Sequence, residues 1–249
     1  MKQSLRLFCL FLLLFTFIGA CAQDEEPFVN PTYTDEFIAE QEAMLENLDT
    51  LFPRTLLKET YDWDSGGTLN NFDGFSFLSK NHGGKRELTV TAVDVSEGDE
   101  FNRGWDLFNT AGSYENFYFC VDVQLIEQDE SNSGWVWFQY SNPLIVGDAY
   151  RAAGEIIFPD KIDTYTTSPA EGRQYKTYYN LTEFENDYEE HRLEMIRLNG
   201  YTSAFIDGHF IVGFEDGFTG RFYHLYGVGL HAGGKYVTYA FDNFTIRRQ

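Results

Sequence analysis

Hydrophobic positions follow two different periods along this chain. Between Thr34 and Phe52 they recur at three- and four-residue spacing, which predicts one amphipathic helix over 34–52. Thr34 is a suitable N-cap for this helix, and Pro53 directly follows its predicted end. From Leu56 onward apolar and polar residues alternate, which is typical of β-strands that bury one face.

The alternating part of the chain predicts an all-β domain over 56–249. Predicted strands cover 87–93, 116–125, 134–140, 192–198, 202–206, 209–212, 228–230 and 236–246. Asp207-Gly208 lies between two of them and is a hairpin signal, because glycine accepts positive φ in a tight turn. The region 141–190 alternates less clearly and is expected to form long loops with a few short strands. Many strands with glycine-rich turns predict a two-sheet antiparallel β-sandwich, a jelly roll.

The N-terminal segment is organised differently from the domain. Lys2 and Arg6 precede an apolar run from Leu7 to Ile18, and this run is too short to span a bilayer as a helix. Basic, apolar and small segments in this order predict a secretory signal peptide over 1–20. Residues 21–33 are acidic, contain two prolines, and are expected to act as a tether.

Ile18-Gly19-Ala20-Cys21 resembles the bacterial lipobox, in which the signal is removed before a cysteine that then carries lipid. The resemblance implies that Cys21 is lipidated with palmitate and that the membrane is reached through this anchor. It also implies a place in the bacterial cell envelope, at the outer membrane or the cell surface. The alternative is an ordinary cleaved signal peptide with an incidental cysteine.

The charge of the chain limits its partners. After removal of residues 1–20, 16 basic and 39 acidic residues remain, a formal charge of 16 − 39 = −23. Binding to nucleic acid depends on Lys and Arg that neutralise phosphates, so we expect no nucleic acid partner. Solubility is the simplest explanation of the acidity. Cys120, the one cysteine inside the predicted domain, is expected to be a small buried apolar residue.

The order of motifs in the C-terminal half resembles a known superfamily. The motifs are the strand 191–197, the Asp-Gly hairpin at 205–210, Gly-Val-Gly-Leu at 227–230 and Phe-Asp-Asn-Phe at 241–244. This order resembles the concanavalin A-like lectin/glucanase superfamily, including its laminin-G-like and 3-keto-disaccharide hydrolase-like bacterial members. The resemblance covers roughly 57–248, and it implies two curved antiparallel sheets whose concave face binds saccharides.

The same resemblance raises the question of catalysis. Retaining glucanases of this superfamily carry Glu-x-Asp-x-Glu on one strand, where period-2 geometry directs all three carboxylates into the cleft. Glu185, Asp187 and Glu189 match these letters and are the candidate catalytic residues. Their surroundings argue against this role, because Asn186 and Tyr188 are not apolar and the segment directly precedes another predicted strand. A non-catalytic role is therefore preferred, and an enzyme of this kind would be a glycoside hydrolase.

Aromatic residues are the candidate ligand-binding groups. Phe, Tyr and Trp make up 18% of the chain, and sugar rings stack on such side chains through their C–H faces. Alternation places the two tryptophans of the 134–140 strand on one face, and only one face of a strand can lie in the core between two sheets. Core packing is the alternative for each of these residues. The candidates are Trp135, Trp137, Tyr201, Tyr223 and Tyr226.

Calcium is a possible structural cofactor, because oxygen ligands are plentiful and jelly-roll domains often hold one ion. Asp242 and Asn243 from the last strand, with Asp62 or Asp64 from the start of the domain, are the candidate ligands. Local hydrogen bonding of Asp242 is the alternative.

Taken together, the sequence predicts an envelope-anchored, non-catalytic carbohydrate-binding lipoprotein. One alternative is a glycoside hydrolase of the same fold that acts on a poly- or disaccharide. Another is a structural envelope lipoprotein without a small ligand.

Overall fold

The computed structural model describes residues 28–59, 75–82, 85–95, 103–113, 115–129, 135–142, 151–168, 172–184, 187–215, 223–231 and 234–249. Two compact units are distinguished, Met1–Asn30 and Pro31–Gln249. Every helix and strand of the described residues lies in the second unit. None of the described helices combines the length and the apolar character needed to cross a membrane.

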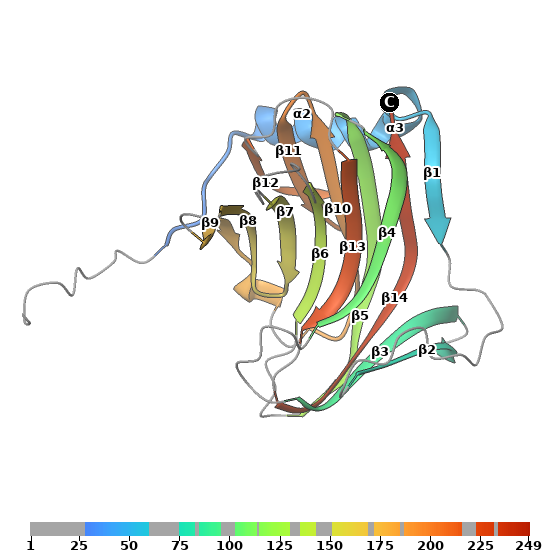
Figure 1. Cartoon of the computed structure of the whole chain (residues 1–249). Helices are drawn as coiled ribbons and strands as arrows, with labels where there is room; N and C mark the ends of the chain where they lie inside the picture. Colours follow the sequence, from blue (N-terminus) through green and yellow to red (C-terminus); the bar gives the residue numbers. More distant parts are fainter. Residues whose placement is uncertain are drawn as a thin grey trace, which may run out of the picture. The chain divides into compact units, whose positions relative to one another are not determined.

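The larger of two antiparallel sheets has eight strands (Figure 1). They are β1 (Arg54–Glu59), β2 (Phe75–His82), β3 (Lys85–Val95), β5 (Phe117–Gln128), β10 (Glu190–Leu198), β11 (Tyr201–Ile206), β12 (His209–Glu215) and β14 (Gly234–Arg248). Their order is β12-β11-β10-β5-β14-β3-β2, and β1 pairs with β14 beside this path. One edge of β14 is shared, because β3 pairs with its first half and β1 with its second.

The smaller sheet has six strands in the order β4-β13-β6-β7-β8-β9. They are β4 (Arg103–Ser113), β6 (Trp135–Asn142), β7 (Arg151–Phe158), β8 (Lys161–Ser168), β9 (Gly172–Asn180) and β13 (Tyr223–His231). A short 3₁₀ helix, η1 (Thr182–Phe184), follows β9. Three of these strands, β7, β8 and β9, occupy the region for which the sequence predicts long loops with a few short strands. Strands are present there, but they are 8, 8 and 9 residues long, so the prediction of long loops was wrong.

The hairpin predicted at Asp207-Gly208 is confirmed. These two residues join β11 to β12, and both have positive φ, 55° and 79°. Such angles match the primed turns that connect antiparallel strands, because their twist fits that of the strands. The Asp207 carboxylate also accepts a hydrogen bond from the backbone N–H of Arg192, at 2.8 Å, which ties the turn to β10.

The core between the sheets is built from the inward-facing apolar side chains of both. Aromatic rings meet across it: Phe119 stacks on Phe138 with centroids 4.3 Å apart, and Phe117 meets Tyr140 edge-on at 5.0 Å. Tyr140 is fully buried, and its hydroxyl is 2.7 Å from the Thr202 hydroxyl. The two sheets therefore pack as one sandwich, as the alternating sequence predicts.

One glycine of β7 is required by this packing. A Cβ added to Gly154 would lie 2.6 Å from the hydroxyl of the buried Tyr140. We expect Gly154→Ala to lower the free energy of unfolding by about 1–3 kcal/mol, measured by urea denaturation, because the ring cannot move without strain. Gly213→Ala is the control, since the atoms nearest to its added Cβ all belong to Tyr201, which is partly exposed and can turn toward solvent. An equal or larger loss in Gly213→Ala would contradict this account.

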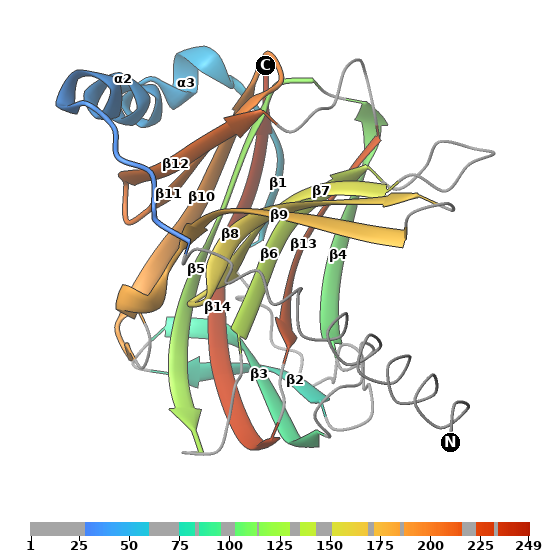
Figure 2. The ribbon, with the colours of Figure 1, turned by 90° about the vertical axis from the view of Figure 1, so that its left-hand side faces the viewer.

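Two helices cover the outer face of the eight-stranded sheet (Figure 2). The sequence predicts one helix over 34–52, whereas the structure has α2 (Asp35–Glu46) and α3 (Leu48–Leu51), with Asn47 between them. The Thr34 side chain accepts a hydrogen bond from the N–H of Phe37, at 3.3 Å, and caps α2. The helices bury a second cluster against β5, β10, β11 and β12. Its fully packed members are Phe52, Tyr118, Cys120, Ile196, Phe205 and Phe210.

Polar contacts fix the helices in place as well. Gln41 accepts a hydrogen bond from the Ser203 hydroxyl at 2.7 Å, and Glu42 accepts one from the backbone N–H of Phe210 at 3.2 Å. Asp49 forms an ion pair with Arg247 at 2.6 Å. The outer face of this sheet is therefore occupied by the chain itself along four strands.

Candidate functional site

The outer face of the six-stranded sheet carries a row of polar side chains on three neighbouring strands. Register aligns Gln139 of β6 with Glu155 of β7, and Glu155 with Asp163 of β8. Their chain neighbours Phe138 and Ile162 lie in the core, so strand alternation places the row on the opposite face. The side chains are nearly inaccessible, with exposed fractions of 2%, 2% and 0%. We call Gln139, Glu155 and Asp163 the polar row.

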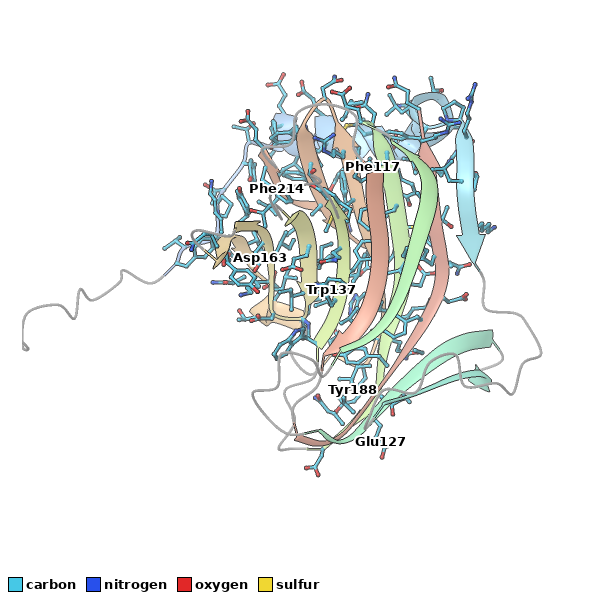
Figure 3. All side chains as sticks on the ribbon, in the orientation of Figure 1. Phe117, Glu127, Trp137, Asp163, Tyr188 and Phe214 are labelled. Carbon is cyan, nitrogen blue, oxygen red and sulfur yellow. The ribbon has the colours of Figure 1, made fainter. Side chains whose placement is uncertain are left out.

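Aromatic and cationic side chains flank the polar row. The indole N–H of the buried Trp137 donates a hydrogen bond to Glu155 Oε2. Lys161 Nζ lies 3.4 Å from Asp163 Oδ2 and 5.9 Å from the ring centroid of Tyr175. Tyr175 is on β9 and is 51% exposed. Figure 3 shows Trp137 and Asp163 on this sheet. The exposed Tyr175 ring thus lies on the edge strand β9, and the buried carboxyl groups of Glu155 and Asp163 lie on the neighbouring inner strands β7 and β8.

Several oxygens of the polar row lack a hydrogen-bond donor. Gln139 Oε1 and both carboxylate oxygens of Asp163 are buried without a hydrogen bond, although Lys161 lies within ion-pair distance of one. An unpaired buried polar group costs about 1–3 kcal/mol, so native proteins pair almost all of them. In native proteins such unmet atoms collect where a ligand, ion or water completes the set. In the carboxylate form of Asp163 all three are acceptors, and the neighbouring Glu155 and Lys161 side chains interact with that carboxylate.

The buried carboxyl of Asp163 makes stability depend on pH. Burial raises the pKa of Asp163 above its usual value of 3.8, and interactions with Glu155 and Lys161 oppose this shift only in part. The folded state then keeps a proton that the unfolded state releases. The free energy of unfolding is therefore expected to fall as pH rises from about 4 through the raised pKa.

Asp163→Asn cannot ionise, so we expect its unfolding free energy to change less over this pH range than that of the wild type, measured by urea denaturation at a series of pH values. Glu183→Gln removes an exposed carboxylate and is expected to leave the wild-type slope unchanged. If the unfolding free energy of Asp163→Asn fell with pH as steeply as that of the wild type, the pH dependence would not come from the Asp163 carboxyl.

The structure brings only some of the predicted aromatic residues together. Trp135 and Trp137 both lie on β6 and share the face of the polar row. Tyr223 and Tyr226 lie on β13 of the same sheet, where the backbone of Tyr226 is opposite Tyr140. Tyr201 lies on β11 of the other sheet, so it is separate from this site.

The predicted carboxylate motif does not lie on a strand. Asp187 and Glu189 are in the loop before β10, where Asp187 Oδ1 accepts a hydrogen bond from the N–H of Glu189 at 2.9 Å. Asp187 Oδ2 is 3.4 Å from Nε2 of the buried His191. Glu185 lies outside the described residues. The segment is therefore a turn that contacts a histidine, and its described carboxylates are not aligned along one strand.

Strand β7 does not carry that motif either. The Glu-x-Asp-x-Glu motif starting at Glu155 would need carboxylates at positions 157 and 159, but these residues are Ile157 and Pro159. The carboxylates on this face come from two neighbouring strands instead of one. A single acidic residue within the apolar stretch Gly-Glu-Ile-Ile-Phe at 154–158 was the sequence signal for this site.

The candidate calcium ligands bond mainly to one another. The Asp242 carboxylate accepts hydrogen bonds from the backbone N–H of Asn243 at 2.7 Å and from its Nδ2 at 3.2 Å. Asn243 Nδ2 also donates to Asp122 Oδ2 at 2.7 Å. Asp62 and Asp64 lie outside the described residues. In the described part of the chain no group of three or more His, Cys, Asp or Glu side chains is arranged to hold a metal ion. Calcium binding stays a prediction.

Cys120 lies in the cluster beneath the helices and not in this site. Burial is the main cause that raises the pKa of its thiol to about 11, so the group is protonated at neutral pH. Its sulfur is 3.8 Å from the carbonyl oxygen of Asn243. A protonated, buried thiol fits the predicted packing role and is a poor nucleophile.

Comparison with protein-family models gives no match, and comparison with curated protein sequences gives none either. Solved structures are similar in fold. An endo-β-1,4-glucuronan lyase from Trichoderma reesei has a TM-score of 0.52 and 14% identity, over 79% of this chain and 96% of that one. A structure from work on endo-acting O-glycanases of the human gut microbiota has a TM-score of 0.52 and 11% identity, over 79% and 100%. A glycoside hydrolase family 16 endo-glucanase from Bacteroides ovatus has a TM-score of 0.50 and 12% identity, over 77% and 99%. The predicted fold is confirmed: the chain is an all-β, two-sheet antiparallel jelly roll.

Proposed function

We propose that this protein binds a carbohydrate on the outer face of the six-stranded sheet. The observation that carries the proposal is the exposed ring of Tyr175 beside the polar row, whose unpaired atoms are all acceptors. A ring stacks on the C–H face of a sugar, and oxygen acceptors receive its hydroxyl protons. A protein of similar fold is an endo-glucanase, which supports this class of ligand.

The opposite outer face favours this choice as well. Helices α2 and α3 occupy the outer face of the eight-stranded sheet along β5, β10, β11 and β12. A saccharide would have to displace a packed apolar cluster to bind there. The six-stranded sheet is therefore the better platform.

The proposal is tested first by presenting the full chain to an array of neutral polysaccharides. Each polysaccharide that binds the protein on the array is then cast into a gel for affinity electrophoresis. We expect at least one neutral glycan to bind and to slow migration. Failure to bind any neutral or amino-substituted polysaccharide would overturn the proposal.

A glycoside hydrolase is the second candidate, and one observation favours it. Glu155 and Asp163 are directly opposite on adjacent strands, so their two carboxyl groups lie side by side on one face of the sheet. Retaining glycosidases use a pair of carboxyl groups, one as nucleophile and one as acid. Incubation with each retained glycan and assay for new reducing ends separates the two candidates, because a binding protein releases none.

We propose that the protein is held in the cell envelope through a lipid on Cys21. Support comes from the lipobox-like order of residues 18–21 after an apolar run. In cells fed labelled palmitate, the chain is expected to incorporate label, and Cys21→Ala is expected to lose it entirely. Equal labelling of both chains, or none in the wild type, would contradict this anchor.

A further inference from the structure

We propose that the edge strand β12 is an interaction surface for a second copy of this chain, and that the N-terminal segment 31–46 keeps it covered. Without this cover, β12 would pair antiparallel with β12 of the other copy, so that the two eight-stranded sheets join. What points to this is that two backbone donors of β12 are occupied by side chains of the segment. This surface is separate from the carbohydrate site, so the proposal goes beyond the proposed function.

Strand β12 is the terminal strand of the eight-stranded sheet, and β11 pairs with one of its edges. The backbone N–H of Phe210 donates to Glu42 Oε1 at 3.2 Å, and that of Gly213 donates to the Tyr33 hydroxyl at 3.4 Å. Both donors therefore point away from β11, as donors on the outer edge of a terminal strand do. Such an edge is a template to which a strand of another chain can add.

Packing holds the segment over this edge in addition to the two hydrogen bonds. The Tyr33 ring stacks on Phe37 with centroids 5.3 Å apart, and both rings meet Phe210 edge-on, at 5.1 and 5.6 Å. Figure 2 shows α2 and the stretch before it beside β12. None of the α2 residues is buried, so the helix lies on the surface of the sheet and is not part of the core between the sheets.

The composition of β12 favours pairing where the edge is open. The strand reads His-Phe-Ile-Val-Gly-Phe-Glu at 209–215, in which four of the seven residues are strong strand formers. It contains neither proline nor lysine, the residues with which edge strands commonly prevent addition of another chain. Protection of this edge therefore depends on the segment that covers it and not on the side chains of the strand itself.

The two ends of β12 make a second copy the fitting partner. In an antiparallel pair centred on Val212, His209 of each copy is opposite Glu215 of the other, which is the self-complementary pattern of a two-fold interface. An imidazole N–H can donate to a carboxylate in that position. In the single chain, His209 Nδ1 lies 3.5 Å from Glu42 Oε1. Glu42 therefore holds the place that Glu215 of the second copy would take.

The test compares the full chain with the double variant Tyr33→Phe/Glu42→Ala by sedimentation equilibrium. This variant loses both acceptors but keeps the ring of residue 33 on Phe210. We expect its dimer association constant to be at least about tenfold larger than that of the wild type, because the freed backbone donors of both copies can pair. Glu40→Ala removes an exposed carboxylate from the same helix, and it is expected to sediment like the wild type.

Tyr33→Phe alone keeps the test decisive if the double variant does not fold, because the ring packing remains. We expect its Gly213 amide to exchange with deuterium faster than in the wild type at low protein concentration, and more slowly as the concentration rises and copies pair. Exchange that does not depend on concentration would overturn the proposal. A folded double variant that dimerises no more than Glu40→Ala would overturn it too. Dimers in which the β12 amides exchange as fast as in the monomer would do the same, because another surface would then join the copies.

Discussion

Phe52→Ala is expected to lower the free energy of unfolding by about 3–5 kcal/mol, the usual cost of truncating a fully buried phenylalanine. Phe52 follows α3 and is completely buried in the cluster between the helices and the eight-stranded sheet. Because this cluster is small and the sheet beneath it is rigid, the space left by the ring cannot collapse. Urea denaturation followed by far-ultraviolet circular dichroism measures the loss.

The control for this variant is Tyr188→Ala, which removes an aromatic side chain that is 48% exposed in the loop before β10. We expect it to change stability by less than about 0.5 kcal/mol. If Phe52→Ala were no more destabilising than Tyr188→Ala, the helices would not be packed as described. The outer face of the eight-stranded sheet would then be open to a ligand.

Tyr175→Ala is expected to weaken carbohydrate binding about tenfold or more. Stacking of a planar ring on an aromatic side chain contributes roughly 1–3 kcal/mol, as measured for bases, and Tyr175 is the exposed ring next to the polar row. Its exposure also means that its removal should leave the fold intact. Titration calorimetry with the retained glycan gives the change in affinity.

Tyr188→Ala is again the matched control, because Tyr188 is exposed to nearly the same extent but lies in a loop outside the six-stranded sheet. We expect wild-type affinity in this variant. A loss of binding in Tyr188→Ala with none in Tyr175→Ala would place the saccharide elsewhere on the molecule.

The sequence predicts the strands of one sheet better than those of the other. In β5 and β10 the inward residues are strongly apolar, and the outward residues also pack, against the helices, so both strands stand out in the sequence. Strand β8 has Ile162 as its one aliphatic residue, and its other positions are polar or aromatic. A strand with a single aliphatic residue does not show the apolar–polar alternation of a half-buried strand, so it resembles a loop when hydrophobicity alone is considered.

The candidate site could not be assembled from the sequence for a related reason. Glu155 and Asp163 are eight positions apart and belong to a hairpin that the sequence does not reveal, so no spacing rule brings them together. Trp137 could be predicted, because alternation separates it from the core residues of β6. That it is buried and donates to Glu155 depends on the neighbouring strand. Tyr175 lies on β9, within the stretch predicted to form loops.

Hydrogen–deuterium exchange of the full chain, with and without a saturating glycan, tests most directly whether the six-stranded sheet is the binding face. We expect slower exchange on binding in the peptides of β6, β7, β8 and β9, and unchanged exchange in β10, β11, β12 and α2. Protection confined to α2 and the strands beneath it would contradict the account.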